Sequence, residues 1–149
     1  MPANTDSTMK TQLLGKIEDR SAVVGVVGLG YVGLPLVMEF VHAGFRVIGY
    51  DVSQRVVDQL MAGVSHIHDV PDADVQAAVT SGSFVATAVE ARLKDCDAIS
   101  IAVPTPLSKT RDPDMSFVLS AADAIARQAR AGICVVLEST TYPGTTREL

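Results

Sequence analysis

Cysteine is scarce in this sequence: Cys96 and Cys134 are the two that occur among 149 residues. Both lie in or beside apolar runs, so we expect buried, unreactive thiols and no disulfide framework. Such a chain fits a reducing compartment, and we expect it in the cytoplasm. Histidine, the other common metal ligand besides cysteine and the carboxylates, is scarce as well, with three in the chain. His66, His68 and Asp69 lie close together without a further well-spaced ligand, so we expect a solvated loop there and no metal site.

An excess of positive charge and long hydrophobic runs are also lacking. The chain has 12 Lys and Arg against 17 Asp and Glu, a net charge of −5. The two signs are interspersed, which excludes the basic surface of a nucleic-acid or anionic-membrane binder. The uncharged run 22–38 is interrupted by glycines and by Pro35, and Glu39 follows it. It is too short and broken for a transmembrane helix, and it begins too far into the chain for a signal peptide.

Glycine, in contrast, is concentrated in an informative place. Residues 23–51 read VVGVVGLGYVGLPLVMEFVHAGFRVIGYD, which is an apolar run, a G-x-G-x-x-G cluster, a helical pattern, a second apolar run and an acid. In such a unit Gly28 allows the tight turn, Gly30 lets a pyrophosphate approach the backbone, and Gly33 lets the helix lie close to the strand. The helix N-terminus adds free N–H groups and a positive dipole end. This frame predicts a dinucleotide site at these glycines and at the intervening Tyr31 and Val32.

The acid that ends this unit, Asp51, indicates which dinucleotide binds. A carboxylate at this point can accept hydrogen bonds from ribose hydroxyls and would repel a 2′-phosphate, so NAD is favoured over NADP. Capping of the following helix is the alternative role of Asp51. Arg55 lies one helical turn further on and could stack on adenine, pair with a phosphate or be solvated. If Arg55 dominated over Asp51, NADP would become plausible.

The rest of the chain alternates apolar runs with helical patterns. Strands are predicted at 23–27, 45–50, 84–87, 98–103 and 133–137. Helices are predicted at 9–17, 31–43, from Ser53 to Gly63, at 71–80 and at 116–130, with a helical turn at 91–94. This alternation predicts a doubly wound, Rossmann-like α/β domain with a parallel sheet in the order 3-2-1-4-5. We expect residues 22–149 to form this domain, behind an N-terminal flank of residues 1–21.

The polar segments after the strands predict where a ligand lies. In open α/β sheets, ligands bind beyond the carboxyl ends of the strands. The glycine turn, Pro104-Thr105-Pro106 and Glu138-Ser139-Thr140 are therefore expected to face one crevice. A sixth strand and a substrate domain are not found in the sequence, so we expect an incomplete domain, truncated before the sixth strand, with one exposed sheet edge.

Three stretches, in this order, resemble the UDP-sugar 6-dehydrogenase family: VGLGYVGLPL, AVPTPLSKTRDPDMS and LESTTYPGTT. The resemblance runs from about Val23 to the end and is closest to the bacterial UDP-N-acetylglucosamine 6-dehydrogenase branch, which serves surface polysaccharide synthesis. UDP-glucose and UDP-N-acetylmannosamine dehydrogenases are the alternatives within the family. The resemblance implies oxidation of the C6 alcohol of a UDP-sugar to a carboxylate by two NAD molecules in turn. It also implies that the intact enzyme is a homo-oligomer.

The resemblance further implies site residues. In that family a threonine after the fourth strand and a glutamate after the fifth lie near the water that hydrolyses a thioester, and here these match Thr105 and Glu138. Val103, Pro104 and Thr105 are also expected to contact NAD. The family's nucleophilic cysteine and its assisting lysine and asparagine belong to a part absent from this sequence. We therefore expect the chain to bind NAD without turning over sugar.

Two other functions share the glycine motif. A stand-alone NAD-binding module without catalysis would need neither Thr105 nor Glu138. A two-domain dehydrogenase of the hydroxyacid type would keep the glycine turn but would not be expected to carry ESTTYPGTT after its fifth strand.

Overall fold

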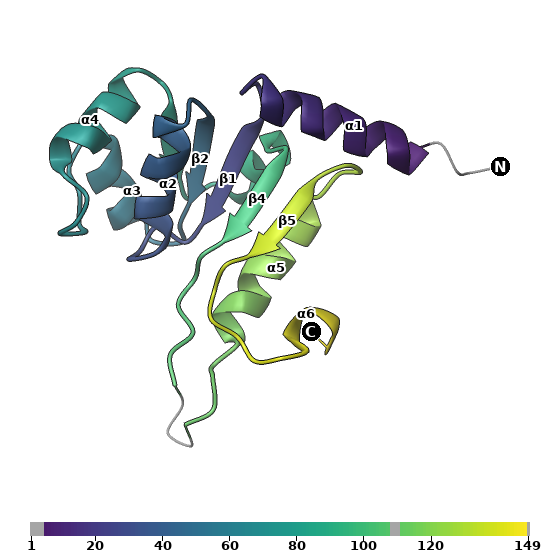
Figure 1. Ribbon diagram of the computed structural model, residues 1–149. Coiled ribbons are helices and arrows are strands. Elements are labelled where there is room, and N and C mark those ends of the chain that lie inside the picture. Colours follow the sequence, from purple (N-terminus) through teal and green to yellow (C-terminus); the bar gives the residue numbers. More distant parts are fainter. Residues whose placement is uncertain (1–4, 108–110, 149) are drawn as a thin grey trace.

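The computed structural model describes residues 5–107 and 111–148, and part of the predicted loop after the fourth strand lies outside them. One parallel sheet of five strands has the order β3-β2-β1-β4-β5 (Figure 1). This is the predicted doubly wound arrangement, which is thereby confirmed. The strands are β1 (Val23–Val27), β2 (Arg46–Tyr50), β3 (Phe84–Thr87), β4 (Ala98–Ile101) and β5 (Cys134–Leu137).

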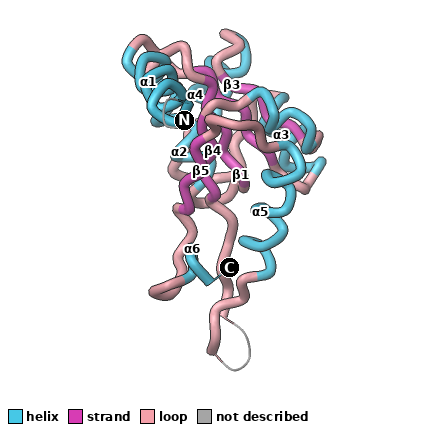
Figure 2. Tube along the Cα trace, turned by 90° about the vertical axis from the view of Figure 1, so that its right-hand side faces the viewer, coloured by secondary structure: helices cyan, strands magenta, loops and turns pink. Residues whose placement is uncertain are grey.

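The helices lie on both faces of this sheet, and Figure 2 shows α2 and α5 on opposite sides of the strands. Apolar side chains of α2, α3 and α4 pack on one face, and those of η1 and α5 pack on the other. The α-helices are α1 (Thr5–Glu18), α2 (Gly33–His42), α3 (Gln54–Met61), α4 (Asp72–Thr80), α5 (Ser116–Gln128) and α6 (Thr145–Glu148), and the 3-10 helix is η1 (Glu90–Asp95). In this described part of the chain, no helix combines the length and the apolar character needed to cross a bilayer.

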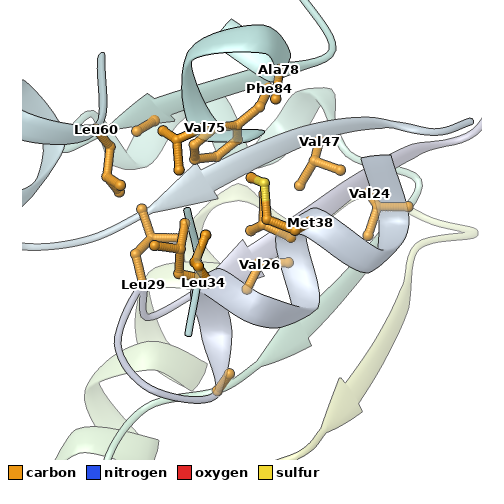
Figure 3. Close-up of a cluster of buried hydrophobic side chains, with 14 of the residues drawn as sticks. Val24, Val26, Leu29, Leu34, Met38, Val47, Leu60, Val75, Ala78 and Phe84 are labelled. Carbon is orange, nitrogen blue, oxygen red and sulfur yellow. The ribbon is translucent and has the colours of Figure 1, made fainter. Parts of the chain in front are cut away.

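The central strand β1 is apolar on both faces, as expected for a strand covered by helices on each side. Val24 and Val26 belong to the α2 side and pack with Leu34 and Met38 (Figure 3). Val27 belongs to the α5 side. The register places Val27 level with both Tyr50 of β2 and Ile101 of β4. The segments that follow these three strands therefore start at the same edge of the sheet.

Several boundaries differ from the sequence-based prediction. α2 begins at Gly33 rather than at residue 31, because residues 28–32 form the turn out of β1. β4 ends at Ile101, two residues early, and α1 is longer than the predicted 9–17. Gly44, with φ of 92°, directly follows the C-cap of α2.

The burial predicted for both cysteines is correct for Cys96 and wrong for Cys134. Cys96 is fully buried in the core on the α5 side of the sheet. Cys134 is exposed because β5 forms an edge of the sheet, where Val135 and Val136 are also 46% and 44% exposed. An apolar run predicts burial only if another layer covers it, and β5 is poorly covered within the described residues.

The N-terminal helix α1 lies near the amino ends of the strands (Figure 1). Lys16 of α1 and Arg130, which follows α5, both donate to Oδ1 of Asp97, at 2.8 and 2.9 Å. Oδ2 of Asp97 accepts from the N–H of Val23 at 2.9 Å. The Asp97 side chain is 8% exposed, and burial opposes its ionisation. The bonds from Lys16, Val23 and Arg130 outweigh that effect and lower its pKa. This carboxylate thereby joins α1 to the start of the sheet.

Candidate functional site

A cavity of about 460 Å³ opens beyond the carboxyl ends of β1, β2 and β4. It extends over the α5 side of the sheet, between the glycine turn, η1 and α5. Its wall is mostly apolar, and its charged lining residues are Asp51, Glu90 and Arg127. This is the position in which open α/β sheets bind their ligands.

The glycine turn forms one side of this cavity. Gly28 has φ of 92°, and a Cβ on it would lie 2.7 Å from the carbonyl oxygen of Ala102. A Cβ on Gly33 would overlap the carbonyl oxygen of Gly28, so α2 can lie this close to the turn only with glycine there. A Cβ on Gly30 would meet no atom within 4 Å, and Gly30 lines the cavity. The backbone at Gly30 is thus open to a ligand, as a pyrophosphate requires.

The N-terminus of α2 follows this turn, and no side chain of the cap or of the first turn binds its free N–H groups or offsets its positive dipole end. Its N-cap residue Val32 makes no side-chain capping bond, and the first turn contains no acid. Tyr31 and Val32 are 83% and 57% exposed and are not among the residues that line the cavity. The helix end can therefore accept an external anion.

Leu29 and Asp51 hold the turn in place. The Leu29 side chain is fully buried and lies beside Leu34 in the core under α2 (Figure 3). Its N–H donates to Oδ2 of Asp51 at 3.0 Å, while Oδ1 of Asp51 accepts from the N–H of Ser53 at 2.9 Å. Ser53, and not Asp51, caps α3, because its hydroxyl accepts from the N–H of Val56. Each carboxylate oxygen has a second lone pair, so Asp51 retains capacity for the hydroxyls of a ribose.

Arg55 lies outside this arrangement. It is exposed on α3, and it is absent from the residues that line the cavity. The cation that does line the cavity is Arg127 of α5.

The segments after β4 and β5 are bonded to each other, and both extend beyond the sheet (Figures 1 and 2). Val103 and Pro104 line the cavity, whereas the half-buried Thr105 next to them does not. The hydroxyl of Ser139 donates to the carbonyl oxygen of Val103 at 2.8 Å. The loop after β5 is thus attached to the loop that forms the cavity wall.

Glu138 does not share the cavity with the glycine turn. Its N–H donates to the carbonyl oxygen of Ile101 at 2.9 Å, but its exposed side chain lines a second groove of about 240 Å³. That groove lies on the α2 side of the sheet and also contains Val136 and Ser100. Glu138 lies there because side chains two positions apart on a strand share a face. The expectation of one common crevice therefore holds for the glycine turn and Pro104 and does not hold for Glu138.

The pair of Glu90 and Arg127 was missed by the sequence reasoning. Nε and a terminal nitrogen of Arg127 donate to the two carboxylate oxygens of Glu90 at 2.9 and 2.8 Å, and Gln128 donates at 3.2 Å. The hydrogen bonds from Arg127 and Gln128 lower the pKa of Glu90 to about 2. Tyr50 lies nearby, and burial, followed by the charge of Glu90, raises its pKa. Glu90 and Arg127 are far apart in the sequence and form no recognisable pattern, so only the fold brings them together.

Across residues 5–107 and 111–148, no three His, Cys, Asp or Glu side chains come together as a metal site would require.

Comparisons with known proteins agree with this geometry. Residues 22–149 match the model of the UDP-glucose/GDP-mannose dehydrogenase family, NAD binding domain. The NDP-N-acetyl-D-galactosaminuronic acid dehydrogenase of Ralstonia nicotianae is 43% identical over 128 residues, which cover 85% of this chain and 29% of that protein. The UDP-N-acetyl-D-mannosamine dehydrogenase of Escherichia coli K12 is 40% identical over 131 residues, which cover 86% of this chain and 30% of the relative. The chain thus spans about 30% of the length of these curated relatives.

Solved structures give the same result. The UDP-D-ManNAc dehydrogenase of Pyrococcus horikoshii superposes with a TM-score of 0.80 at 35% identity, over 85% of this chain and 30% of that one. A diketoreductase superposes with a TM-score of 0.60 at 20% identity and so shares the fold alone. The chain belongs to the UDP-glucose/GDP-mannose dehydrogenase family as its NAD-binding domain, and its cofactor is NAD.

Proposed function

We propose that the full-length protein oxidises the C6 alcohol of a UDP-N-acetylhexosamine to the carboxylate and that this chain supplies its NAD site. The observation that carries the proposal is the family match over residues 22–149, together with relatives named for N-acetylated sugars at 40% and 43% identity. Within this class, UDP-N-acetylglucosamine is the first substrate to test, because the three sequence motifs resemble that branch. UDP-N-acetylmannosamine is the second.

The same proposal assigns roles around the cavity. Bound NAD would accept a hydride from the sugar carbon. The open backbone at Gly30 and the uncapped N-terminus of α2 would receive the pyrophosphate. Asp51, which is fixed by its bonds to the N–H groups of Leu29 and Ser53, would accept hydrogen bonds from the adenosine ribose. Val103 and Pro104 would form the wall on the β4 side.

Thr105 and Glu138 are proposed to act on the hydrolytic water. A threonine hydroxyl can donate and accept, and a carboxylate can orient or deprotonate water. Both residues follow neighbouring strands, and the loops that carry them are joined by the bond from Ser139 to Val103. Because Glu138 is exposed on the α2 side of the sheet, its role requires that the substrate part of the enzyme also approach from that side.

The wider setting belongs to this proposal too. We place residues 22–149 in the cofactor domain and residues 1–21 in its flank, which agrees with the start of the family match. We also propose that the full-length enzyme is a homo-oligomer in the cytoplasm and that it serves surface polysaccharide synthesis.

The test is the reduction of NAD by the full-length protein with UDP-N-acetylglucosamine, UDP-N-acetylmannosamine, UDP-glucose and GDP-mannose. We expect the fastest reduction with an N-acetylated sugar, with two molecules of NADH formed per sugar. Glu138→Gln should slow turnover and leave NAD affinity unchanged. The proposal fails if no nucleotide sugar supports NADH formation, or if UDP-glucose or GDP-mannose is the best substrate.

A further inference from the structure

The cavity wall formed by η1 and α5 is closed by an ion pair that the glycine motif does not account for. Glu90 is the first residue of η1, and Arg127 lies in the last turn of α5. Both line the cavity, and their two-point contact joins the two elements directly. The pair is therefore part of the wall rather than a contact elsewhere on the surface.

This contact lies at the end of the cavity that the adenosine would occupy. Tyr50 is the last residue of β2, immediately before Asp51, and it packs in the same buried cluster as Leu93 of η1 and Ala124 of α5. Tyr50, Asp51 and Val52 line the same cavity. The ion pair thus faces the half of the site next to the proposed ribose-binding carboxylate.

The ion pair also lowers the negative charge of the cavity. The charged residues of the cavity lining are Asp51, Glu90 and Arg127. Without the guanidinium, two carboxylates would face a dinucleotide that itself carries negative phosphates, and like charges in a partly desolvated cleft repel. With Arg127 bound to Glu90, the second carboxylate is neutralised and held against the wall.

We propose that the Glu90–Arg127 pair is a positioning element that fixes the width of the adenosine half of the NAD site. Its side chains are 27% and 59% exposed, so it contributes little to folding stability, as is usual for exposed ion pairs. Its contribution is instead to hold η1 and α5 at the separation that the adenosine requires, which reduces the ordering cost of binding. The inference rests on NAD binding in this cavity and not on the identity of the sugar.

The test measures the affinity of the chain for ADP-ribose, which lacks the nicotinamide, by calorimetry. Arg127→Met, Glu90→Gln and the double variant should each weaken binding by about three- to fivefold, and the losses should not add. Arg127→Lys keeps the charge but not the two-point contact and should recover part of the affinity. The matched control is Arg92→Met, which breaks the Arg92–Asp95 pair of the same element outside the cavity and should bind as the wild type does.

A second readout separates positioning from folding. The urea midpoints of the unliganded Arg127→Met and Arg92→Met variants should be similar. The inference is wrong if Arg127→Met binds as the wild type does, if Glu90→Gln binds more tightly, or if the affinity loss follows a lowered midpoint. If the wild type does not bind ADP-ribose, the cavity is not a cofactor site, and both the inference and the proposed function are wrong.

Discussion

The N–H of Leu29 donates to the carboxylate of Asp51 at 3.0 Å, and this bond joins the glycine turn to the end of β2. The carboxylate therefore has a structural role even without a ligand, since it fixes the turn that the pyrophosphate would approach. Its second oxygen holds Ser53 and thereby the start of α3. The geometry of the phosphate end and the proposed ribose contact thus depend on one side chain.

Replacing Asp51 should affect binding and stability together. In Asp51→Ala the N–H groups of Leu29 and Ser53 lose a charged acceptor, which should lower the free energy of unfolding by about 1–3 kcal/mol. NAD affinity should fall by about tenfold or more, and NADP affinity should fall less, because the carboxylate repels the 2′-phosphate. Calorimetric titration with both cofactors measures the ratio.

Ser53→Ala is the matched control for that experiment. It removes the α3 cap, which costs about 1 kcal/mol, and leaves the Asp51 carboxylate in place. It should not change the ratio of NAD to NADP affinity. Equal losses of the two affinities in Asp51→Ala would argue against the ribose role.

Replacement by alanine should affect stability at Gly33 and NAD binding at Gly30. Gly33→Ala brings a methyl group into the carbonyl oxygen of Gly28 and should destabilise the fold by about 3 kcal/mol. Gly30→Ala meets no atom within 4 Å, so its free energy of unfolding should stay within about 0.5 kcal/mol of the wild type. Because its methyl group points into the open space, NAD affinity should fall by about tenfold. Unfolding and titration of the two variants test this, and a stable Gly33→Ala would contradict the packing.

The free energy of unfolding should fall at low pH, because the Asp97 carboxylate becomes protonated. The pKa of this carboxyl is lower in the folded chain than in the unfolded one, so its contribution is present above the unfolded pKa of about 4 and is lost as the pH falls through the folded value. Asp97→Asn should cost about 2 kcal/mol near pH 7, and the difference from the wild type should shrink below about pH 4. Urea unfolding between pH 7 and 2.5 measures this, with Asp58→Asn as the control; a constant difference would exclude the linkage.

The two thiols should differ in reactivity. Cys134 is exposed on β5, whereas Cys96 is buried, and burial, followed by the charges of Asp95 and Asp97, raises the pKa of Cys96 to about 12. A disulfide reagent at pH 8 should therefore modify one thiol per native chain and two in urea. Cys134→Ser should abolish the fast reaction, and a persisting fast thiol in that variant would place Cys96 at the surface.

The sequence predicted those features that depend on local patterns. The order of elements from β1 to Asp51 was predicted correctly, apart from the first residues of α2 and β2, because its apolar runs, glycines and acid each act within a few residues of one another. β3 was predicted with its observed bounds for the same reason. The errors depend on tertiary packing. The exposure of Cys134 depends on what covers β5, and the groove that Glu138 lines depends on which face of β5 lies on the α2 side of the sheet. The Glu90–Arg127 contact depends on how η1 packs against α5, which no local pattern specifies.

The central claim is that the cavity beyond β1, β2 and β4 is an NAD site with a preference for the cofactor that lacks a 2′-phosphate. Calorimetric titration of the chain with NAD and NADP tests it most directly. The structure predicts saturable binding of NAD, with weaker binding of NADP. No measurable NAD binding at millimolar concentration, or tighter binding of NADP than of NAD, would contradict it.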